Sequence, residues 1–280
     1  MTVRPETGRR CVFIDFDGTF ADHGIAPGAH AEAVRRAREN GHVVLLCTGR
    51  PASIVAPEVA ALFDGVVTSA GAHVRVGEEV LRDDRFPEDL ARRTTELLLE
   101  ARAVFALEAP EAMYCTPGLA ESIREHVRAA EAPASGSIGR GPQDILDAVR
   151  TPDDLPDRSF AKVSVWESPV PVEQVAAQLG AAIGALPNSI SADGLHSGEL
   201  HLAAIDKADG VRQVAAHLGF GIEATVGIGD GMNDVGMLRA TGTAVGIEGA
   251  APAVLEAATF VVPGPSGHGI VAAFERLGMI

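Results

Sequence analysis

Two carboxylates at alternate positions, Asp15 and Asp17, are the first residues of this 280-residue chain that could do chemistry together. They follow the apolar run 11–14, and alternate residues of an extended backbone lie roughly 6–7 Å apart. Because burying an isolated ionised carboxylate is costly, we expect both acids at an open edge of a sheet. There they could act on one centre, as ligands of a cation or as a nucleophile and a proton donor. The competing interpretation is an ordinary Asp-Gly turn after a strand.

Three further polar clusters have residue types suited to the same centre. In chain order they are Thr48-Gly49-Arg50, Lys207 and Asp230-Gly231-Met232-Asn233-Asp234. A hydroxyl and backbone amides near a helix start bind anions, and a lysine ammonium suits a phosphoryl oxygen. The carboxylates of Asp230 and Asp234 are hard oxygen ligands of the kind that Mg²⁺ prefers.

Each cluster also has a plainer interpretation. Thr48 could form a local turn through its hydroxyl, and Asp230 and Asp234 could serve as a turn former and a helix cap. Arg50 could contact a substrate or a second domain, or simply lie at the surface. Lys207 could be a solvated lysine, but of 23 basic residues only Lys162 and Lys207 are lysine. A surface position in this chain would more naturally hold arginine.

The elements that must position these residues alternate between strand and helix. Strands are predicted at 42–47 and 65–69 after the opening run, with helices at 27–41 and 53–62 between them. The same alternation returns late in the chain. Strands are predicted there at 199–202, 225–229, 244–247 and 260–262, with a helix at 207–218. This alternation predicts an α/β fold with a doubly wound parallel sheet. Ligands bind such sheets at the carboxyl ends of the strands, where all four clusters would meet.

The middle of the chain follows a different pattern. A hairpin is predicted near 73–79 and a helix at 87–103. Strands at 104–107 and 162–166 and helical segments near 119–130, 143–149 and 172–183 follow at irregular spacing. We therefore predict one domain formed by 1–77 and 197–280, with 78–196 inserted into it as a second, mixed α+β domain.

With these residues and their order in view, the chain resembles the haloacid dehalogenase superfamily of phosphotransferases, in its Cof-like sugar-phosphatase branch. The segments Asp15-Phe16-Asp17-Gly18-Thr19 and Gly229-Asp230-Gly231-Met232-Asn233-Asp234 are together very specific for it. Thr48-Gly49-Arg50 and Lys207 are weak signals alone but strong in this order and spacing. The resemblance covers both outer thirds of the chain and implies a HAD-like core with a large inserted cap.

The expected activity is hydrolysis of a small phosphorylated metabolite with Mg²⁺ as cofactor. Asp15 would attack phosphorus and form an aspartyl-phosphate, and Asp17 would act as general acid and then as general base. Asp15, Asp230 and Asp234 would hold the metal, and the resemblance adds the backbone carbonyl of Asp17. Thr48, Gly49 and Lys207 would bind the phosphate and, by resemblance, so would Asn233.

Other functions share parts of this pattern. A phosphomutase has the same catalytic residues but must shield its phosphoaspartate from water. A phosphoacceptor signalling module also uses an acceptor Asp, yet such modules are shorter and lack an acid two residues later. A non-catalytic phosphate-binding protein is a further alternative, although every residue needed for turnover is present.

Composition excludes some partners and compartments. The net charge of −15 argues against nucleic acid and against an anionic membrane surface. No apolar stretch approaches the roughly 20 residues that span a bilayer, and the run after Arg9 and Arg10 is too short for a signal peptide. Three cysteines without metal-type spacing indicate a reducing compartment. We therefore expect a cytoplasmic enzyme.

Overall fold

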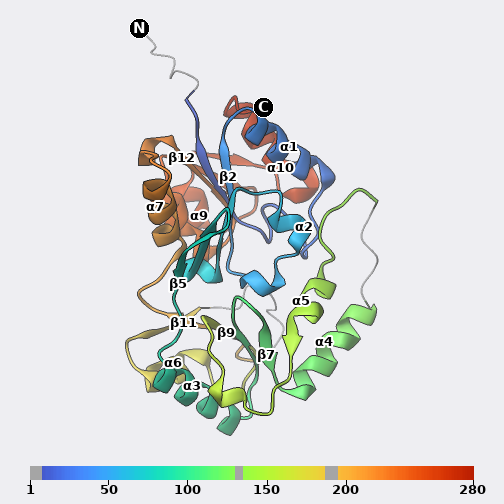
Figure 1. Ribbon diagram of the computed structural model, residues 1–280, viewed down its shortest axis with the longest axis vertical. Coiled ribbons are helices and arrows are strands. Elements are labelled where there is room, and N and C mark those ends of the chain that lie inside the picture. Colours follow the sequence, from blue (N-terminus) through green and yellow to red (C-terminus); the bar gives the residue numbers. More distant parts are fainter. Residues whose placement is uncertain (1–7, 130–134, 187–194) are drawn as a thin grey trace.

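The computed structural model describes residues 8–129, 135–186 and 195–280, and its strands form two separate sheets (Figure 1). The first sheet has eight strands in the order β14-β13-β12-β1-β2-β3-β4-β5. Their bounds are Cys11–Ile14 (β1), Val43–Cys47 (β2), Gly65–Thr68 (β3), His73–Val76 (β4), Glu79–Asp83 (β5), Thr225–Gly229 (β12), Thr243–Ile247 (β13) and Phe260–Val262 (β14). The six strands from β14 to β3 are parallel, which confirms the predicted fold class.

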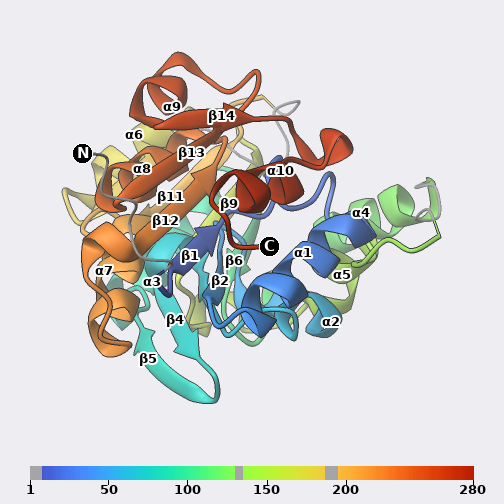
Figure 2. The same cartoon turned by 90° about the horizontal axis from the view of Figure 1, so that it is seen from above.

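Helices cover both faces of this sheet, as Figure 2 shows from above. They are Gly28–Glu39 (α1), Pro57–Ala60 (α2), Lys207–His217 (α7), Val235–Ala240 (α8), Pro252–Ala257 (α9) and Gly269–Arg276 (α10). Alternate strand residues bury against opposite helices because successive side chains of a strand point to opposite faces. Val12 and Ile14 pack in the cluster that includes α1 and α10, whereas Cys11 and Phe13 pack in the cluster that includes α7.

The second sheet has six strands in the order β10-β11-β9-β6-β7-β8 and lies below the first in Figure 1. Its strands are Val104–Glu108 (β6), Met113–Cys115 (β7), Val149–Arg150 (β8), Lys162–Glu167 (β9), Ile183–Leu186 (β10) and Gly198–Leu202 (β11). Its helices are Glu88–Glu100 (α3), Pro117–Ala129 (α4), Pro142–Ala148 (α5) and Val172–Leu179 (α6). The helices α3 and α6 cover the face turned away from the first sheet.

Two strands near the predicted cap boundaries pair otherwise than expected. The strand β5 continues the β4 hairpin and belongs to the first sheet, although 78–196 was predicted to form the cap. The strand β11 pairs antiparallel with β9 and β10 in the second sheet, not in the parallel rhythm of the first. The alternation of polar and apolar residues in β11 fits an antiparallel strand with one polar face. The division into core and cap itself stays a prediction, and 1–7, 130–134 and 187–194 lie outside the described residues.

Two predicted helices are shorter than expected. The segment 53–62 forms a three-residue 3₁₀ turn and the short α2, because Pro57 lacks an amide hydrogen and disfavours helical geometry at Ala56. The helix predicted at 172–183 ends at Leu179, where Gly180 takes φ +95° before β10 begins.

Two structural observations bear on location. All three cysteines are buried and free. In the part of the chain that the structure describes, none of the helices combines the length and the apolar character needed to span a bilayer.

The core of the first sheet should dominate stability. Phe13 is fully buried in β1, so Phe13→Ala should lower the free energy of unfolding by about 3–5 kcal/mol, measured by urea denaturation. Val80→Ala is the matched control, because Val80 lies on edge strand β5 with 54% of its surface exposed, and should change stability by less than about 0.5 kcal/mol. Equal losses for the two variants would contradict this packing.

Candidate active site

Three acidic side chains meet at the carboxyl ends of β1 and β12. Asp15, Asp230 and Asp234 each offer a carboxylate oxygen, and these oxygens lie within 4.8 Å of one another. The parallel pairing of β1 with β12 makes this possible, and it continues in a hydrogen bond of 2.9 Å from the Asp15 amide to the Ile228 carbonyl. The structure thus brings together three of the predicted metal ligands.

Lys207 is buried among these acids. Its Nζ donates hydrogen bonds to Asp15 Oδ1 at 2.5 Å and to Asp234 Oδ1 at 2.6 Å. It is the first residue of α7, whose start is fixed by reciprocal hydrogen bonds between Asp206 and Asp209. Burial opposes the charge of Lys207, but Asp15 and Asp234 raise its pKa above the ordinary value, so the side chain is an ammonium ion. The interpretation of Lys207 as a solvated lysine is wrong, since none of its side chain is exposed.

The cluster carries more negative charge than Lys207 balances. Burial and the charge of Asp234 raise the pKa of Asp15 well above its usual range, although Lys207 opposes this shift. Burial also raises the pKa of Asp230, against a hydrogen bond of 2.6 Å from the Thr19 hydroxyl. A divalent cation would relieve this repulsion, and carboxylate oxygens are the donors that Mg²⁺ takes. The residues present therefore fit a magnesium ion.

Of its plainer interpretations, Asp234 fits the turn former and not the cap of α8, because its side chain makes no capping hydrogen bond to that helix. Its Oδ2 accepts hydrogen bonds from the amides of Asp230 at 3.1 Å and Gly231 at 2.8 Å, which fixes the turn before α8. Asp234 is fully buried, whereas Asp230 is partly exposed. Of the two, Asp230 is therefore the more open to an incoming ion.

Asp17 is paired with Arg50 rather than free. The Arg50 guanidinium donates to both carboxylate oxygens of Asp17, at 2.6 and 2.7 Å, and lies 4.8 Å from the centre of the Phe16 ring. Arg50 is 6% exposed, so the surface interpretation is wrong. Its Nη2 lies close to Gly24, since a Cβ at Gly24 would be 3.2 Å away. A bidentate pair of this kind fixes the orientation of the Asp17 carboxylate.

The predicted phosphate-binding loop is only partly as expected. The Thr48 hydroxyl accepts a hydrogen bond of 3.1 Å from the Arg50 amide, which is the local turn of its plainer interpretation. The Thr48 amide donates to the Val67 carbonyl at 2.8 Å, so this amide serves the sheet and not an anion. Gly49 and Asn233 do lie together, because a Cβ at Gly49 would be 3.4 Å from Asn233 Nδ2.

Three residues near the site had no predicted role. Thr19 holds Asp230, and Gly18 takes φ +82° with room only for hydrogen, since a Cβ there would lie 2.3 Å from Asp230 Oδ2. Lys162 of β9 reaches the same loop, because a Cβ at Gly49 would be 3.9 Å from its Nζ. The rarity of lysine in the sequence was the available signal for Lys162.

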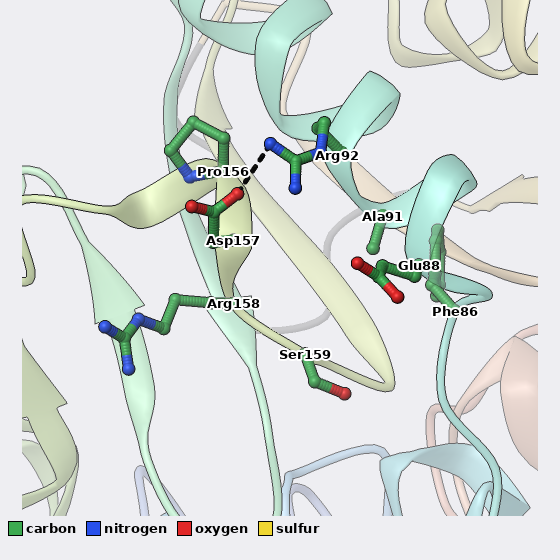
Figure 3. Close-up of a pocket in the computed structure, with 8 residues that line it drawn as sticks. All are labelled: Phe86, Glu88, Ala91, Arg92, Pro156, Asp157, Arg158 and Ser159. Carbon is green, nitrogen blue, oxygen red and sulfur yellow. Dashed lines mark ion pairs between the residues drawn. The ribbon is translucent and has the colours of Figure 1, made fainter.

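A pocket elsewhere is not the active site. A cavity of about 280 Å³ lies between α3 and the turn at 155–159. Figure 3 draws its lining residues and the ion pair of Arg92 with Asp157, in which Nη1 and Oδ1 are 2.7 Å apart. Both members of this pair are about half exposed. None of the predicted catalytic or metal-binding residues lines this cavity.

Known proteins are similar to this chain over nearly its whole length. YkrA of Bacillus subtilis (strain 168), a phosphatase by name, is 24% identical over 276 residues, covering 97% of this chain and 98% of YkrA. The structure of the HAD subclass IIB sugar phosphatase BT4131 matches with a TM-score of 0.74 at 19% identity, over 97% of this chain and all of the other. The structure of BT1666 from Bacteroides thetaiotaomicron matches with a TM-score of 0.75 at 23% identity, over 100% of this chain and 99% of the other.

These likenesses to solved structures show a shared fold. The sequence model of the haloacid dehalogenase-like hydrolases matches residues 12–274, which spans nearly all of the described chain and both sheets. The family that the motifs predicted is confirmed, and this chain belongs to the haloacid dehalogenase-like hydrolases.

Proposed function

We propose that this hydrolase is a Mg²⁺-dependent phosphatase of small phosphorylated metabolites, with Asp15 as its nucleophile. The observation that carries the proposal is the convergence of Asp15, Asp230 and Asp234 around the buried ammonium of Lys207. The names of the phosphatase YkrA and the sugar phosphatase BT4131 support the reaction and the kind of substrate.

Mg²⁺ would be held by the side chains of Asp15, Asp230 and Asp234 and by the backbone carbonyl of Asp17. When bound, the ion neutralises charge between the anionic nucleophile and the anionic phosphate. Lys207 keeps a positive charge beside Asp15 Oδ1, which stabilises the ionised nucleophile and a nearby phosphoryl oxygen. Gly49, Asn233 and the Thr48 hydroxyl would orient the phosphate.

The reaction would take two steps. A carboxylate oxygen of Asp15 attacks phosphorus, the ester oxygen leaves with a proton from Asp17, and an aspartyl-phosphate remains. Asp17 then removes a proton from water, which attacks the phosphorus and releases phosphate and the free carboxylate of Asp15. Arg50 would hold Asp17 in place through its two hydrogen bonds to the carboxylate.

The second sheet would cover the site and choose the leaving group. The two parts already touch through a bridge between Ala26 and Ile138 and through a hydrogen bond of 2.9 Å from the Ser53 hydroxyl to the Ala109 carbonyl. Closure over the site would exclude bulk water during the transfer. The three free cysteines support the proposal of a reducing, cytoplasmic location.

The nucleophile can be tested directly. Asp15→Asn should lower kcat for p-nitrophenyl phosphate by about 10³-fold or more, because an amide cannot form the covalent intermediate. Asp22→Asn is the matched control, since Asp22 lies nearby with 72% of its side chain exposed, and should keep activity within a factor of two or so. Activity of Asp15→Asn near that of the wild type would remove Asp15 as the nucleophile.

Metal binding can be tested through stability. Saturating Mg²⁺ should raise the thermal midpoint of the wild type, because a ligand at 100 times its Kd adds about 2.7 kcal/mol. Gly18→Ala should lose this response, since its Cβ would displace the Asp230 carboxylate. Gly41→Ala is the matched control, because Gly41 has a similar φ of +89° and nothing within 4 Å of an added Cβ. Differential scanning fluorimetry with and without Mg²⁺ measures the thermal midpoint of both variants. A Mg²⁺ response of Gly18→Ala equal to that of the wild type would contradict the proposed metal site.

The pair of Arg50 with Asp17 predicts a positioning effect. Arg50→Ala should lower kcat about 10- to 100-fold with a smaller change in KM, because Asp17 loses its orientation. Arg50→Lys should restore little, since an ammonium cannot form the two parallel hydrogen bonds. Arg38→Ala breaks another arginine–aspartate pair, with Asp64, and should leave kcat unchanged. Steady-state kinetics with p-nitrophenyl phosphate decides, and full activity of Arg50→Ala would refute the role.

A further inference from the structure

Three consecutive residues directly after β3 have a left-handed backbone. The φ angles of Ser69, Ala70 and Gly71 are +49°, +55° and +108°. Residues other than glycine rarely adopt such angles, because their Cβ comes too close to the following carbonyl oxygen. Among residues 8–129, 135–186 and 195–280, no other two adjacent non-glycine residues both have a positive φ. Strained backbone persists where surrounding contacts determine it, and it clusters at active sites.

On one side, this turn is hydrogen-bonded to the loop that follows β2. The Ser69 amide donates to the Arg50 carbonyl at 2.8 Å. The Ala70 amide donates to the Thr48 carbonyl at 3.1 Å. The Ser69 hydroxyl is buried and has no hydrogen-bond partner within the described residues, so the backbone alone makes these contacts. The left-handed conformation thus turns two consecutive amides toward the loop whose Arg50 side chain pairs with Asp17.

On the other side, the turn packs against the start of α7. A Cβ at Gly71 would lie 2.2 Å from the Asp206 carbonyl oxygen and 3.4 Å from the Lys207 amide nitrogen. Both are backbone atoms, which cannot rotate away as the end of a side chain can. The Nζ of Lys207 donates hydrogen bonds to Asp15 and Asp234. The absence of a side chain at Gly71 therefore sets how closely α7 approaches the carboxyl edge of the sheet.

The turn is itself fixed to the first sheet. It follows β3 directly, and a hydrogen bond of 3.2 Å from the Ala72 amide to the Ser69 carbonyl closes it. The Gly71 carbonyl accepts a further hydrogen bond of 3.3 Å from Arg82 Nη1, which belongs to β5. These contacts make the turn a rigid support between the loop after β2 and the start of α7.

We propose that the turn 69–71 is a positioning element of the active site, which holds the loop after β2 and the start of α7 in place. Ala70 acts through Arg50, and Gly71 acts through Lys207. Neither residue touches the substrate. This role rests on the proposed phosphatase function and adds two positioning residues to it.

Substitution of Gly71 tests the contact with α7. Gly71→Ala should lower kcat for p-nitrophenyl phosphate about 10- to 100-fold, because the added Cβ displaces Lys207 from the nucleophile. Gly41→Ala is the matched control, since Gly41 also has a positive φ, of +89°, but nothing within 4 Å of an added Cβ. It should keep kcat within about 2-fold of the wild type. Equal kcat values for the two variants would overturn the proposal.

A double-mutant cycle tests whether Gly71 acts through Lys207. In the Lys207→Ala background, Gly71→Ala should lower kcat by less than a further 3-fold or so, because the ammonium that it displaces is already absent. A purely structural role would add the full loss again, and that result would overturn the proposal. Where Lys207→Ala is unfolded or inactive, a crystal structure of Gly71→Ala decides. Its Lys207 Nζ should lie farther than 2.5 Å from Asp15 Oδ1, and an unchanged pair would contradict the role.

Two substitutions of Ala70 test the left-handed conformation. Ala70 is partly exposed, so a larger side chain acts mainly on the backbone. Valine opposes a positive φ, whereas glycine adopts it at no steric cost. The kcat of Ala70→Gly should therefore exceed that of Ala70→Val by about 10-fold or more. Equal values would overturn the role of Ala70, and where Ala70→Val does not fold, the comparison of Gly71→Ala with its control decides alone.

A second cycle separates positioning from folding at this residue. If Ala70 acts through Arg50, then Arg50→Ala should lower the kcat of Ala70→Val by less than about 3-fold, well below its effect on the wild type. Full and independent losses would contradict the role. Failure of the wild type to hydrolyse p-nitrophenyl phosphate with Mg²⁺ would instead refute the phosphatase function itself.

Discussion

One buried ammonium group holds the carboxyl edge of the first sheet together. Lys207 Nζ joins Asp15, directly after β1, to Asp234, in the turn between β12 and α8. Removing one partner of such a buried pair typically costs about 3–5 kcal/mol, because the other charge remains without compensation. The position of Lys207 is fixed by the hydrogen-bonded start of α7. Gly71 packs closely against this start, since a Cβ at Gly71 would lie 2.2 Å from the Asp206 carbonyl oxygen. Yet one ammonium cannot balance three carboxylates, and the raised pKa values of Asp15 and Asp230 express that excess. The carboxylates at this edge therefore keep negative charge that a second cation would neutralise.

The second sheet complements this edge with chemistry of its own. Its outer face is apolar under α3 and α6, and its inner face holds an ion-paired lysine beside the catalytic loop. Successive side chains of β6, β9 and β11 point to opposite faces of the sheet, so the same strands can have one apolar face and one charged face.

Much of the first sheet could be predicted because parallel strands bring their carboxyl ends to one edge. That rule places Asp15 beside Asp230 without knowledge of any side-chain conformation. It cannot foresee that Arg50 pairs with Asp17 or that the Thr48 amide bonds to Val67, because these depend on loop geometry and rotamers. The strand β11 was placed in the wrong sheet, since alternation alone does not say which sheet a strand joins. Pro57 was a readable signal that the helix at 53–62 would break. Lys162 was noticed for its rarity, but its role depends on contacts between the two sheets.

The central claim is that a divalent cation binds between the nucleophile and the acids at the end of β12. The most direct measurement is a crystal structure grown with Mn²⁺, which substitutes for Mg²⁺ at oxygen sites and is located by its anomalous scattering. We expect one strong anomalous peak within about 2.0–2.3 Å of carboxylate oxygens of both Asp15 and Asp230. A peak bound elsewhere, or none at a Mn²⁺ concentration that supports hydrolysis, would contradict it.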